Sequence, residues 1–191
     1  MRNLVLFMHV SLDGFVADPD GGLEWITLED EIFEFVKQRT DAADTALYGR
    51  VTYEMMQAYW PTAADQPGAT KHDIEHSAWY NQVDKVVLSR TIQGENLPKT
   101  TVISNNLVQE ITWLKQSKGR EILIFGSPSA AHSLMAEKLI DELWLFINPV
   151  LLGHGIPLFK ESNEKTLLAL IDGHTFPSGV VCLNYRLRQG N

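Results

Sequence analysis

Cysteine is nearly absent from this sequence, since Cys182 is the only one in 191 residues. A single cysteine cannot form an internal disulfide. It lies within the short apolar run 180–183, where a free cysteine usually behaves as a small buried hydrophobe. No basic neighbour is evident in the sequence to activate the thiol, so we expect a structural role for Cys182 and not a reactive one.

Long apolar runs and an excess of positive charge are also lacking. No apolar stretch reaches the ~20 residues that a membrane helix needs. The N-terminus lacks a signal-peptide pattern, and we therefore expect a cytoplasmic protein with no membrane partner. The net charge is −8, and phosphate backbones and anionic lipids attract basic faces, so nucleic acid is not expected as a partner either. Any phosphate that this protein binds must therefore be contacted by a few local basic groups and by backbone amides.

The composition is otherwise that of an ordinary globular protein, with 45% hydrophobic and 21% charged residues. The sequence contains no internal repeat, low-complexity tract or linker, so residues 1–191 are predicted to form a single domain. Short strand-like runs alternate with helix-like segments along most of the chain. This alternation predicts an α/β fold with a largely parallel sheet.

Residues 4–10 form a continuous apolar run and predict a buried first strand. The pattern Thr27-x-x-Asp30 predicts the N-terminal cap of a helix that begins at Thr27. Near the C-terminus, residues 167–176 and 180–187 predict an antiparallel edge hairpin around a Pro-Ser-Gly turn. The other expected strands are 45–48, 85–88, 101–103, 121–125 and 143–150, the other expected helices are 50–56, 74–80, 104–114 and 127–138, and the main expected loops are 60–68 and 152–157.

The most informative segment is Ile122-Leu123-Ile124-Phe125-Gly126-Ser127-Pro128-Ser129. A predicted strand ends at Gly126, where the missing side chain permits a ligand to approach the backbone. Ser127 is a good helix cap and Pro128 suits the first helical position. The free amides and the dipole of such a helix start attract phosphate, although a plain strand-to-helix turn would have the same sequence.

Two further strand ends have the same character. Gly49, Arg50 and Thr52 follow one predicted strand, and Ser89 and Arg90 follow the next. Arginine makes bidentate contacts to phosphate, and ligands of open α/β sheets lie outside the carboxyl ends of the strands. The glycine spacing matches neither the Rossmann motif nor the P-loop. The pattern therefore predicts a phosphate-containing ligand held in a non-standard way.

In these motifs the chain resembles the dihydrofolate-reductase-like superfamily, and within it the reductase domain of the bifunctional riboflavin-biosynthesis deaminase/reductase. The motifs that support the resemblance lie at residues 11–17, 49–52, 85–90, 125–129 and 141–159. They span nearly the whole chain in order. The fold implied is a three-layer α/β/α arrangement with a mainly parallel mixed sheet and a C-terminal antiparallel hairpin.

The resemblance also implies NADPH as cofactor. The cofactor would lie across the sheet, with the turns at Gly49 and Gly126 holding its pyrophosphate. Arg50, Ser89 and Arg90 would surround the 2′-phosphate, and His9 and Val16 would lie near the nicotinamide. The other implied cofactor-binding residues are Gly49, Thr52, Leu88, Phe125, Gly126, Ser127, Pro128 and Ser129. One departure is that the family usually has a second glycine where this chain has Ser127.

Asp30 is the candidate proton donor. In dihydrofolate reductases an acidic residue of the first helix follows a tryptophan by five positions, and Trp25 and Asp30 have that spacing. A carboxylate in a half-apolar cleft can relay a proton to a reduced C=N bond. Asp30 could equally be only a helix cap, and Glu31 and Glu34 keep the assignment open.

The substrate pocket is expected in loops around Trp25, Tyr53 and Trp60, although Trp60 could instead be a core residue. The pair His72-x-x-x-His76 would place two imidazoles on one helix face, as zinc sites require. No third ligand stands out, so we expect an exposed polar face and no metal.

The function predicted is NADPH-dependent reduction of a small heterocycle. By resemblance the reaction is the reduction of 5-amino-6-(5-phosphoribosylamino)uracil in riboflavin biosynthesis. Two alternatives remain open, a reductase of dihydrofolate or another pterin, and a non-catalytic NADPH-binding protein. The lack of a fused deaminase domain favours the second of these. The resemblance and the apolar strand 143–150 beside the edge hairpin also predict a homodimer.

Overall fold

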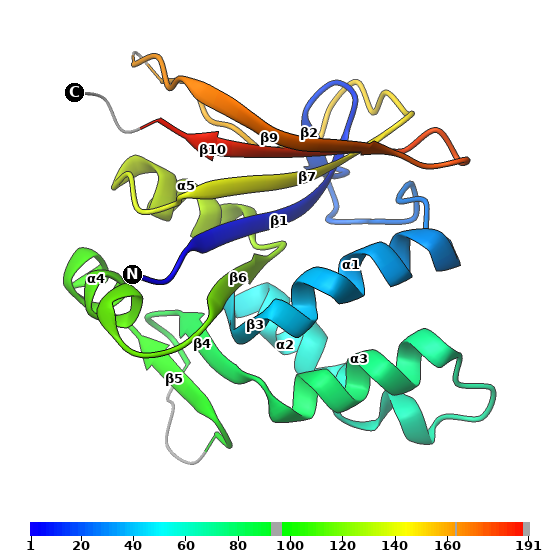
Figure 1. The fold of residues 1–191 in the computed structure, drawn as a ribbon, viewed down its shortest axis with the longest axis horizontal. Helices are drawn as coiled ribbons and strands as arrows, with labels where there is room; N and C mark the ends of the chain where they lie inside the picture. Colours follow the sequence, from blue (N-terminus) through cyan, green and yellow to red (C-terminus); the bar gives the residue numbers. More distant parts are fainter. Residues whose placement is uncertain (93–96, 163, 189–191) are drawn as a thin grey trace.

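A computed structural model describes residues 1–92, 97–162 and 164–188. Its centre is an eight-stranded sheet in the order β5-β4-β3-β6-β1-β7-β10-β9 (Figure 1). Neighbouring strands from β5 to β7 run parallel, whereas β10 runs antiparallel to both β7 and β9. The prediction of a mainly parallel mixed sheet with a C-terminal antiparallel hairpin at its edge is confirmed.

The described strands agree closely with the apolar runs of the sequence. They are β1 (Leu4–Ser11), β3 (Ala43–Gly49), β4 (Asp84–Leu88), β5 (Thr100–Ile103), β6 (Glu121–Phe125), β7 (Glu142–Asn148), β9 (Leu168–Thr175) and β10 (Val181–Leu187). Two short strands, β2 (Phe15–Ala17) and β8 (Ile156–Pro157), pair separately. Residues 156–157 were expected in a loop, and two residues are too few to give a strand pattern.

The described helices are α1 (Asp30–Ala42), α2 (Arg50–Tyr59), the 3-10 helix η1 (Trp60–Asp65), α3 (Lys71–Gln82), α4 (Leu107–Gln116) and α5 (Pro128–Ala136). The prediction that a helix begins at Thr27 is wrong, because α1 begins at Asp30. The Thr27 N–H donates to Asn148 Oδ1 at 2.9 Å, and this long-range contact ties residue 27 to the sheet. The loop expected at 60–68 contains η1. None of the helices in the described ranges is long and apolar enough to cross a bilayer.

The two faces of the sheet bury different helices. Leu4, Leu6 and Met8 alternate along β1 toward one face, where they join a cluster with side chains of α4 and α5. Val5 points to the other face, where the cluster includes side chains of α1, α2 and α3. This period of two is what a central strand covered on both faces requires. The result is the three-layer α/β/α arrangement.

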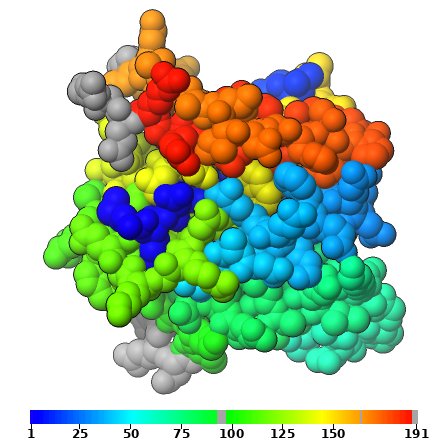
Figure 2. Space-filling view, in the orientation of Figure 1, coloured from blue at the N-terminus to red at the C-terminus, as the bar shows by residue number. Residues whose placement is uncertain are grey.

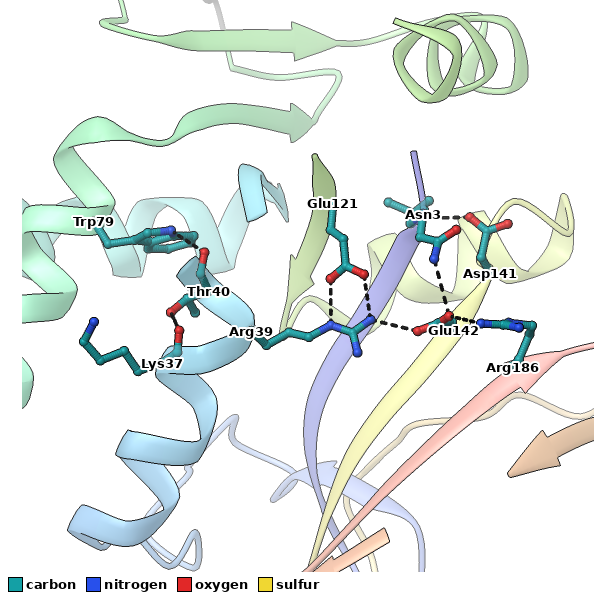
Figure 3. A network of polar contacts seen from close by, with 10 residues as sticks. Asn3, Lys37, Arg39, Thr40, Trp79, Glu121, Asp141, Glu142 and Arg186 are labelled. Carbon is teal, nitrogen blue, oxygen red and sulfur yellow. Dashed lines mark hydrogen bonds and ion pairs between the residues drawn. The ribbon is translucent and has the colours of Figure 1, made fainter. Parts of the chain in front are cut away.

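A network of ion pairs around the buried Glu142 lies at the N-terminal ends of β6 and β7 (Figure 3). Glu142 starts β7 and is almost fully buried. Its carboxylate accepts hydrogen bonds from Arg39 at 2.8 Å and from Arg186 at 3.0 Å. Arg39, near the end of α1, also makes a two-pronged contact to Glu121 at 2.7 and 3.1 Å. These contacts attach α1 to β6, β7 and β10.

The C-terminal hairpin forms one edge of the molecule (Figure 2). Cys182 on β10 is buried, and burial raises the pKa of its thiol to about 12, which confirms the structural role expected for it. The outermost strand, β9, has exposed apolar side chains at Leu168, Leu170 and Ile171. Its outer edge pairs with no strand among the described residues.

Candidate active site

A cleft of about 890 Å³ opens at the carboxyl ends of β1, β3 and β6. Its volume lies in the range of small-molecule and cofactor sites. The floor comes from the strand ends, and the walls come from α2, α5 and the segment that precedes α1. The residues lining it are Phe7, Met8, His9, Val16, Ala17, Gly21, Leu23, Ile26, Gly49, Val51, Thr52, Met55, Met56, Phe125, Gly126, Ser127, Pro128, Ser129, His132, Ser133, Ala136, Ile156 and Lys160.

The turn between β6 and α5 has an unusual backbone. Gly126 and Ser127 both have a positive φ, at 53° and 59°. Ser127 thus takes the left-handed conformation that a second glycine would adopt easily, at the cost that a Cβ imposes there. Ser127 is the N-cap residue of α5, as expected, but its side chain makes no capping bond to that helix. Its Oγ instead accepts a hydrogen bond from the Gly49 N–H at 2.8 Å.

This hydrogen bond joins the two strand-to-helix turns of the cleft. Gly49 ends β3 and is the N-cap residue of α2, as Ser127 is of α5. A Cβ on Gly49 would lie 3.4 Å from Ser129 Oγ, and a Cβ on Gly126 would lie 3.5 Å from Thr52 Cγ2. The first amides of a helix have no partner within that helix. Two helix N-termini therefore face one cleft, and both favour an anion there.

Most of the sequence-predicted cofactor residues come together in this cleft. They are His9, Val16, Gly49, Thr52, Phe125, Gly126, Ser127, Pro128 and Ser129. The residues expected near the 2′-phosphate are outside the lining. Arg50 is exposed and pairs with Glu54 at 2.7 Å, and Arg90 is exposed. The Ser89 hydroxyl accepts hydrogen bonds from the next turn, and Leu88 ends β4 on the neighbouring strand.

Sequence reasoning missed the apolar walls of the cleft. Leu23 and Ile26 reach it because the turn at 18–22 folds back on itself, where Asp18 accepts the Gly22 N–H at 2.7 Å. Val51, Met55 and Met56 line it from α2, and only the helical period of that segment could have indicated a shared face. Lys160 is the only lysine or arginine among the described lining residues, and no motif pointed to it.

Asp30 is the first residue of α1 and lies outside that cleft. It lines a second cavity of about 390 Å³ between α1 and α3. The described lining of the large cleft includes no aspartate or glutamate. Glu34 also lines the smaller cavity, where Lys71 pairs with it and lowers the pKa of its carboxyl.

The three residues predicted to form the substrate pocket do not line the large cleft either. Tyr53 is buried in the core against Tyr48, and the Trp25 indole N–H is buried without an acceptor among the described residues. Trp60 packs against the ring of His76 at 4.1 Å, and His76 in turn lines the smaller cavity. The histidine pair does not form the exposed polar face that was expected, because both imidazoles are half-buried and that of His76 packs between aromatic rings. This burial lowers the pKa of His76 to about 3.

His72 stacks on Phe33 at 3.8 Å, so this histidine also takes part in the aromatic packing between α1 and α3.

The chain is similar to known proteins over nearly its whole length. A model of the family described as "RibD C-terminal domain" matches residues 2–182. The uncharacterized protein YyaP of Bacillus subtilis is 32% identical over 188 residues, which cover 96% of this chain and 94% of YyaP. A putative riboflavin biosynthesis protein of Shewanella sp. PV-4 superposes with a TM-score of 0.74 at 24% identity, over 99% of this chain and 100% of that one.

Two further structures show the same fold at lower identity. One is the diaminohydroxyphosphoribosylaminopyrimidine deaminase/5-amino-6-(5-phosphoribosylamino)uracil reductase of Thermotoga maritima, with a TM-score of 0.68 at 15% identity over 98% of this chain and 57% of that one. The other is a dihydrofolate reductase of Enterococcus faecalis complexed with NADP(H), with a TM-score of 0.59 at 16% identity over 98% and 97%. The predicted dihydrofolate-reductase-like fold is confirmed.

Proposed function

The chain belongs to the RibD C-terminal domain family, and we propose that it is an NADPH-dependent reductase of a small heterocycle. The observation that supports this most strongly is the convergence of two helix N-termini on one cleft, joined by the hydrogen bond from Gly49 to Ser127. A dinucleotide brings a pyrophosphate, and paired helix starts are suited to hold it. The apolar walls from α2 and the segment before α1 suit the flat rings at either end of such a cofactor.

When bound, NADPH supplies the hydride. The chain's own residues bind and orient both reactants. The amides at the starts of α2 and α5 hold the anionic centre of the cofactor, while Leu23 and Ile26 exclude water from the ring end of the cleft. The reductase activity in the name of the Thermotoga maritima protein makes 5-amino-6-(5-phosphoribosylamino)uracil the first substrate to test.

Asp30 remains our candidate for relaying the proton that follows the hydride. It starts α1 and lines the smaller cavity, which has no described lining residue in common with the large cleft. The two meet where the ring of Phe125, which lines the cleft, packs 5.3 Å from Trp79, which lines the cavity. Asp30→Asn should lower turnover about 10²- to 10⁴-fold and leave NADPH affinity unchanged. Glu110→Gln, also in the first turn of a helix but on the opposite face of the sheet, is the matched control. Equal turnover of the two variants would restrict Asp30 to a structural role.

Selection of NADPH over NADH is assigned to Arg50 and Arg90. The two residues follow adjacent strands and both are exposed, so a 2′-phosphate bound beyond the lining of the cleft would be accessible to them. Binding would require Arg50 to exchange Glu54 for the phosphate, which carries more negative charge. Replacing both arginines with alanine should weaken NADPH at least about tenfold and leave NADH nearly unchanged, as measured by calorimetric titration. An unaltered preference would mean that other residues recognise the 2′-phosphate.

We also propose that the protein is a homodimer that pairs through β9. The apolar side chains of Leu168, Leu170 and Ile171 are exposed on this strand, and its outer edge is unpaired among the described residues. Apolar edge strands in stable proteins are usually covered. A second copy of the same strand is the simplest cover, because a two-fold axis brings identical apolar surfaces together.

A second candidate function is NADPH binding without turnover. The observation that favours it is the lack of a carboxylate among the described residues of the large cleft. Two measurements separate the candidates: the binding of NADPH to the protein, and the oxidation of NADPH in the presence of each member of a panel of pyrimidines and pterins. Oxidation that depends on one of the heterocycles supports the reductase. Binding without oxidation by any compound supports the non-catalytic protein.

A further inference from the structure

His9 lies near the end of β1, in the wall of the large cleft. Its imidazole stacks on the ring of Phe146 with 5.0 Å between the centroids and 25° between the planes. The ring of Phe7 meets it edge-on at 5.7 Å. Two aromatic neighbours therefore restrain the plane of the imidazole. Its position is set by the core, so any hydrogen bond that it makes into the cleft has a defined direction.

Asn148 ends β7 beside His9 and is fully buried. Its Oδ1 accepts the Thr27 N–H at 2.9 Å, and its Nδ2 donates to the Phe146 carbonyl at 3.0 Å. The reversed amide would place its NH2 group against the Thr27 N–H and its oxygen against a carbonyl oxygen. Both contacts would be repulsive, so two backbone partners fix the orientation of this amide.

The fixed amide determines the tautomer of His9. Asn148 Nδ2 lies 3.4 Å from His9 Nδ1, and its second hydrogen is the one available for this contact. Since Asn148 is the donor in this contact, His9 Nδ1 is the acceptor and the ring proton resides on Nε2. The Nε2 atom makes no hydrogen bond to any described residue. It is also not one of the polar side-chain atoms that are fully buried without a hydrogen-bond partner in the described chain. A neutral N–H group is therefore presented to the cleft.

The surroundings keep this imidazole uncharged. Burial lowers the pKa of His9 to about 4. The other titratable side chains in the described lining are His132 and Lys160, and neither would favour a positive charge on His9. The Nε2 of His132 is already engaged by the carbonyls of Pro157 and Leu158 at 3.1 and 2.9 Å. His9 at neutral pH can thus donate a hydrogen bond but has no acidic proton to transfer.

We propose that the Nε2–H of His9 positions a carbonyl oxygen or an unprotonated ring nitrogen of a ligand in the cleft, and that Asn148 acts as a positioning residue by fixing the His9 tautomer. The acceptor can belong to the carboxamide of the cofactor or to a carbonyl of the heterocycle, because both have the same hydrogen-bonding chemistry. This choice of ligands rests on the proposed function. The tautomer does not, because it follows from contacts within the chain.

The tautomer can be measured by ¹⁵N NMR of histidine-labelled protein without any ligand, with the His9 signals assigned through their loss in His9→Phe. The Nε2–H form should persist unchanged from neutral pH down to about pH 5. An Nδ1–H form, or titration near the ordinary histidine pKa, would overturn the assignment. Asn148→Asp replaces the donor with a carboxylate oxygen and should move the proton to Nδ1. Asn184→Asp, a buried amide-to-carboxylate change on β10, should leave the tautomer unchanged.

If Asn148→Asp fails to fold, the wild-type spectrum alone still decides the tautomer. The ligand is then identified by adding NADPH first and 5,6-diaminouracil second. A shift of the Nε2 signal with NADPH assigns the acceptor to the cofactor, and a shift only with diaminouracil assigns it to the heterocycle. Binding of both compounds without either shift would overturn the donor role.

Calorimetry gives an independent measure of the contact. His9→Phe keeps an aromatic ring but removes the donor, and should weaken the responsible ligand about 2- to 10-fold. His174→Phe, in which the changed ring packs on Phe35 outside the cleft, should leave its affinity unchanged. Unaltered affinity in His9→Phe would contradict the donor role. Failure of both compounds to bind would overturn the ligand assignment and the proposed function together. The tautomer of His9 would still be decided independently, because it is measured without ligand.

Discussion

Replacing Gly126 with alanine separates the requirements of the fold from those of cofactor binding. The added Cβ would lie 3.5 Å from Thr52 Cγ2, which is ordinary van der Waals contact, so it fits sterically. The positive φ of 53° imposes a backbone cost of roughly 1–2 kcal/mol on a residue with a Cβ. The domain should therefore fold, with a melting temperature lower by several degrees.

The cost to the cofactor should be larger. The methyl group would stand between the starts of α2 and α5, where the pyrophosphate is proposed to approach the backbone. Losing one charge-assisted hydrogen bond there costs about 1.5–3 kcal/mol, which corresponds to an NADPH affinity roughly 10- to 100-fold weaker. Calorimetric titration measures this change directly.

Gly179→Ala is the matched control, because Gly179 has a φ of 89° and its Cβ would lie 3.5 Å from Pro149 Cγ. This residue lies in the turn between β9 and β10, outside the described lining of the cleft. Both variants should lose similar stability, and only Gly126→Ala should lose affinity. Wild-type affinity in Gly126→Ala, or equal losses in the two variants, would refute the placement of the pyrophosphate.

Acid should destabilise the protein, because burial holds the pKa of His9 near about 4 and that of His76 near about 3, below their unfolded values. Below pH ~6.5 the unfolded chain binds more protons than the folded one, so the contribution of these two histidines to the free energy of unfolding is complete only above that pH. It should fall by on the order of several kcal/mol toward pH 4. Urea titrations that show no loss of stability over this range would contradict the prediction. Arg39→Met removes a donor from the buried Glu142 and should cost about 3 kcal/mol, whereas an unchanged urea midpoint would mean that the pair is energetically neutral. Light scattering should give the mass of two chains for the wild type and of one chain for Leu170→Asp, and a monomeric wild type would exclude the dimer.

Local sequence signals were sufficient to predict the strands of the eight-stranded sheet, the edge hairpin and the glycine turns. Each depends on periodicity or on residues close together in the chain, as at Gly126. The start of α1 could not be predicted in this way. Residue 27 lies outside the helix, and its N–H donates to Asn148, which is 121 positions away in the chain. A local capping pattern cannot reveal such a long-range contact.

The same reason explains which site residues were missed. Gly49 and Ser127 are individually recognisable, but the hydrogen bond between them exists only because β3 and β6 are neighbours in the sheet. Lys160 and Leu23 reach the cleft through loops that have no periodic pattern. The tautomer of His9 depends on three separate segments of the chain. Strand-end chemistry was therefore predictable, whereas the cleft walls and the polar network required the tertiary structure.

The most direct test of the reductase proposal follows the transferred hydride itself. Wild-type protein would be incubated with 5-amino-6-(5-phosphoribosylamino)uracil, or with dihydrofolate, and NADPH deuterated at the transferable position of the nicotinamide. Mass spectrometry should find one deuterium in the reduced product, and the rate of its transfer should fall strongly in Gly126→Ala and not in Gly179→Ala. NADPH that binds but transfers no deuterium to either compound, or transfer at equal rates in the two variants, would contradict the account.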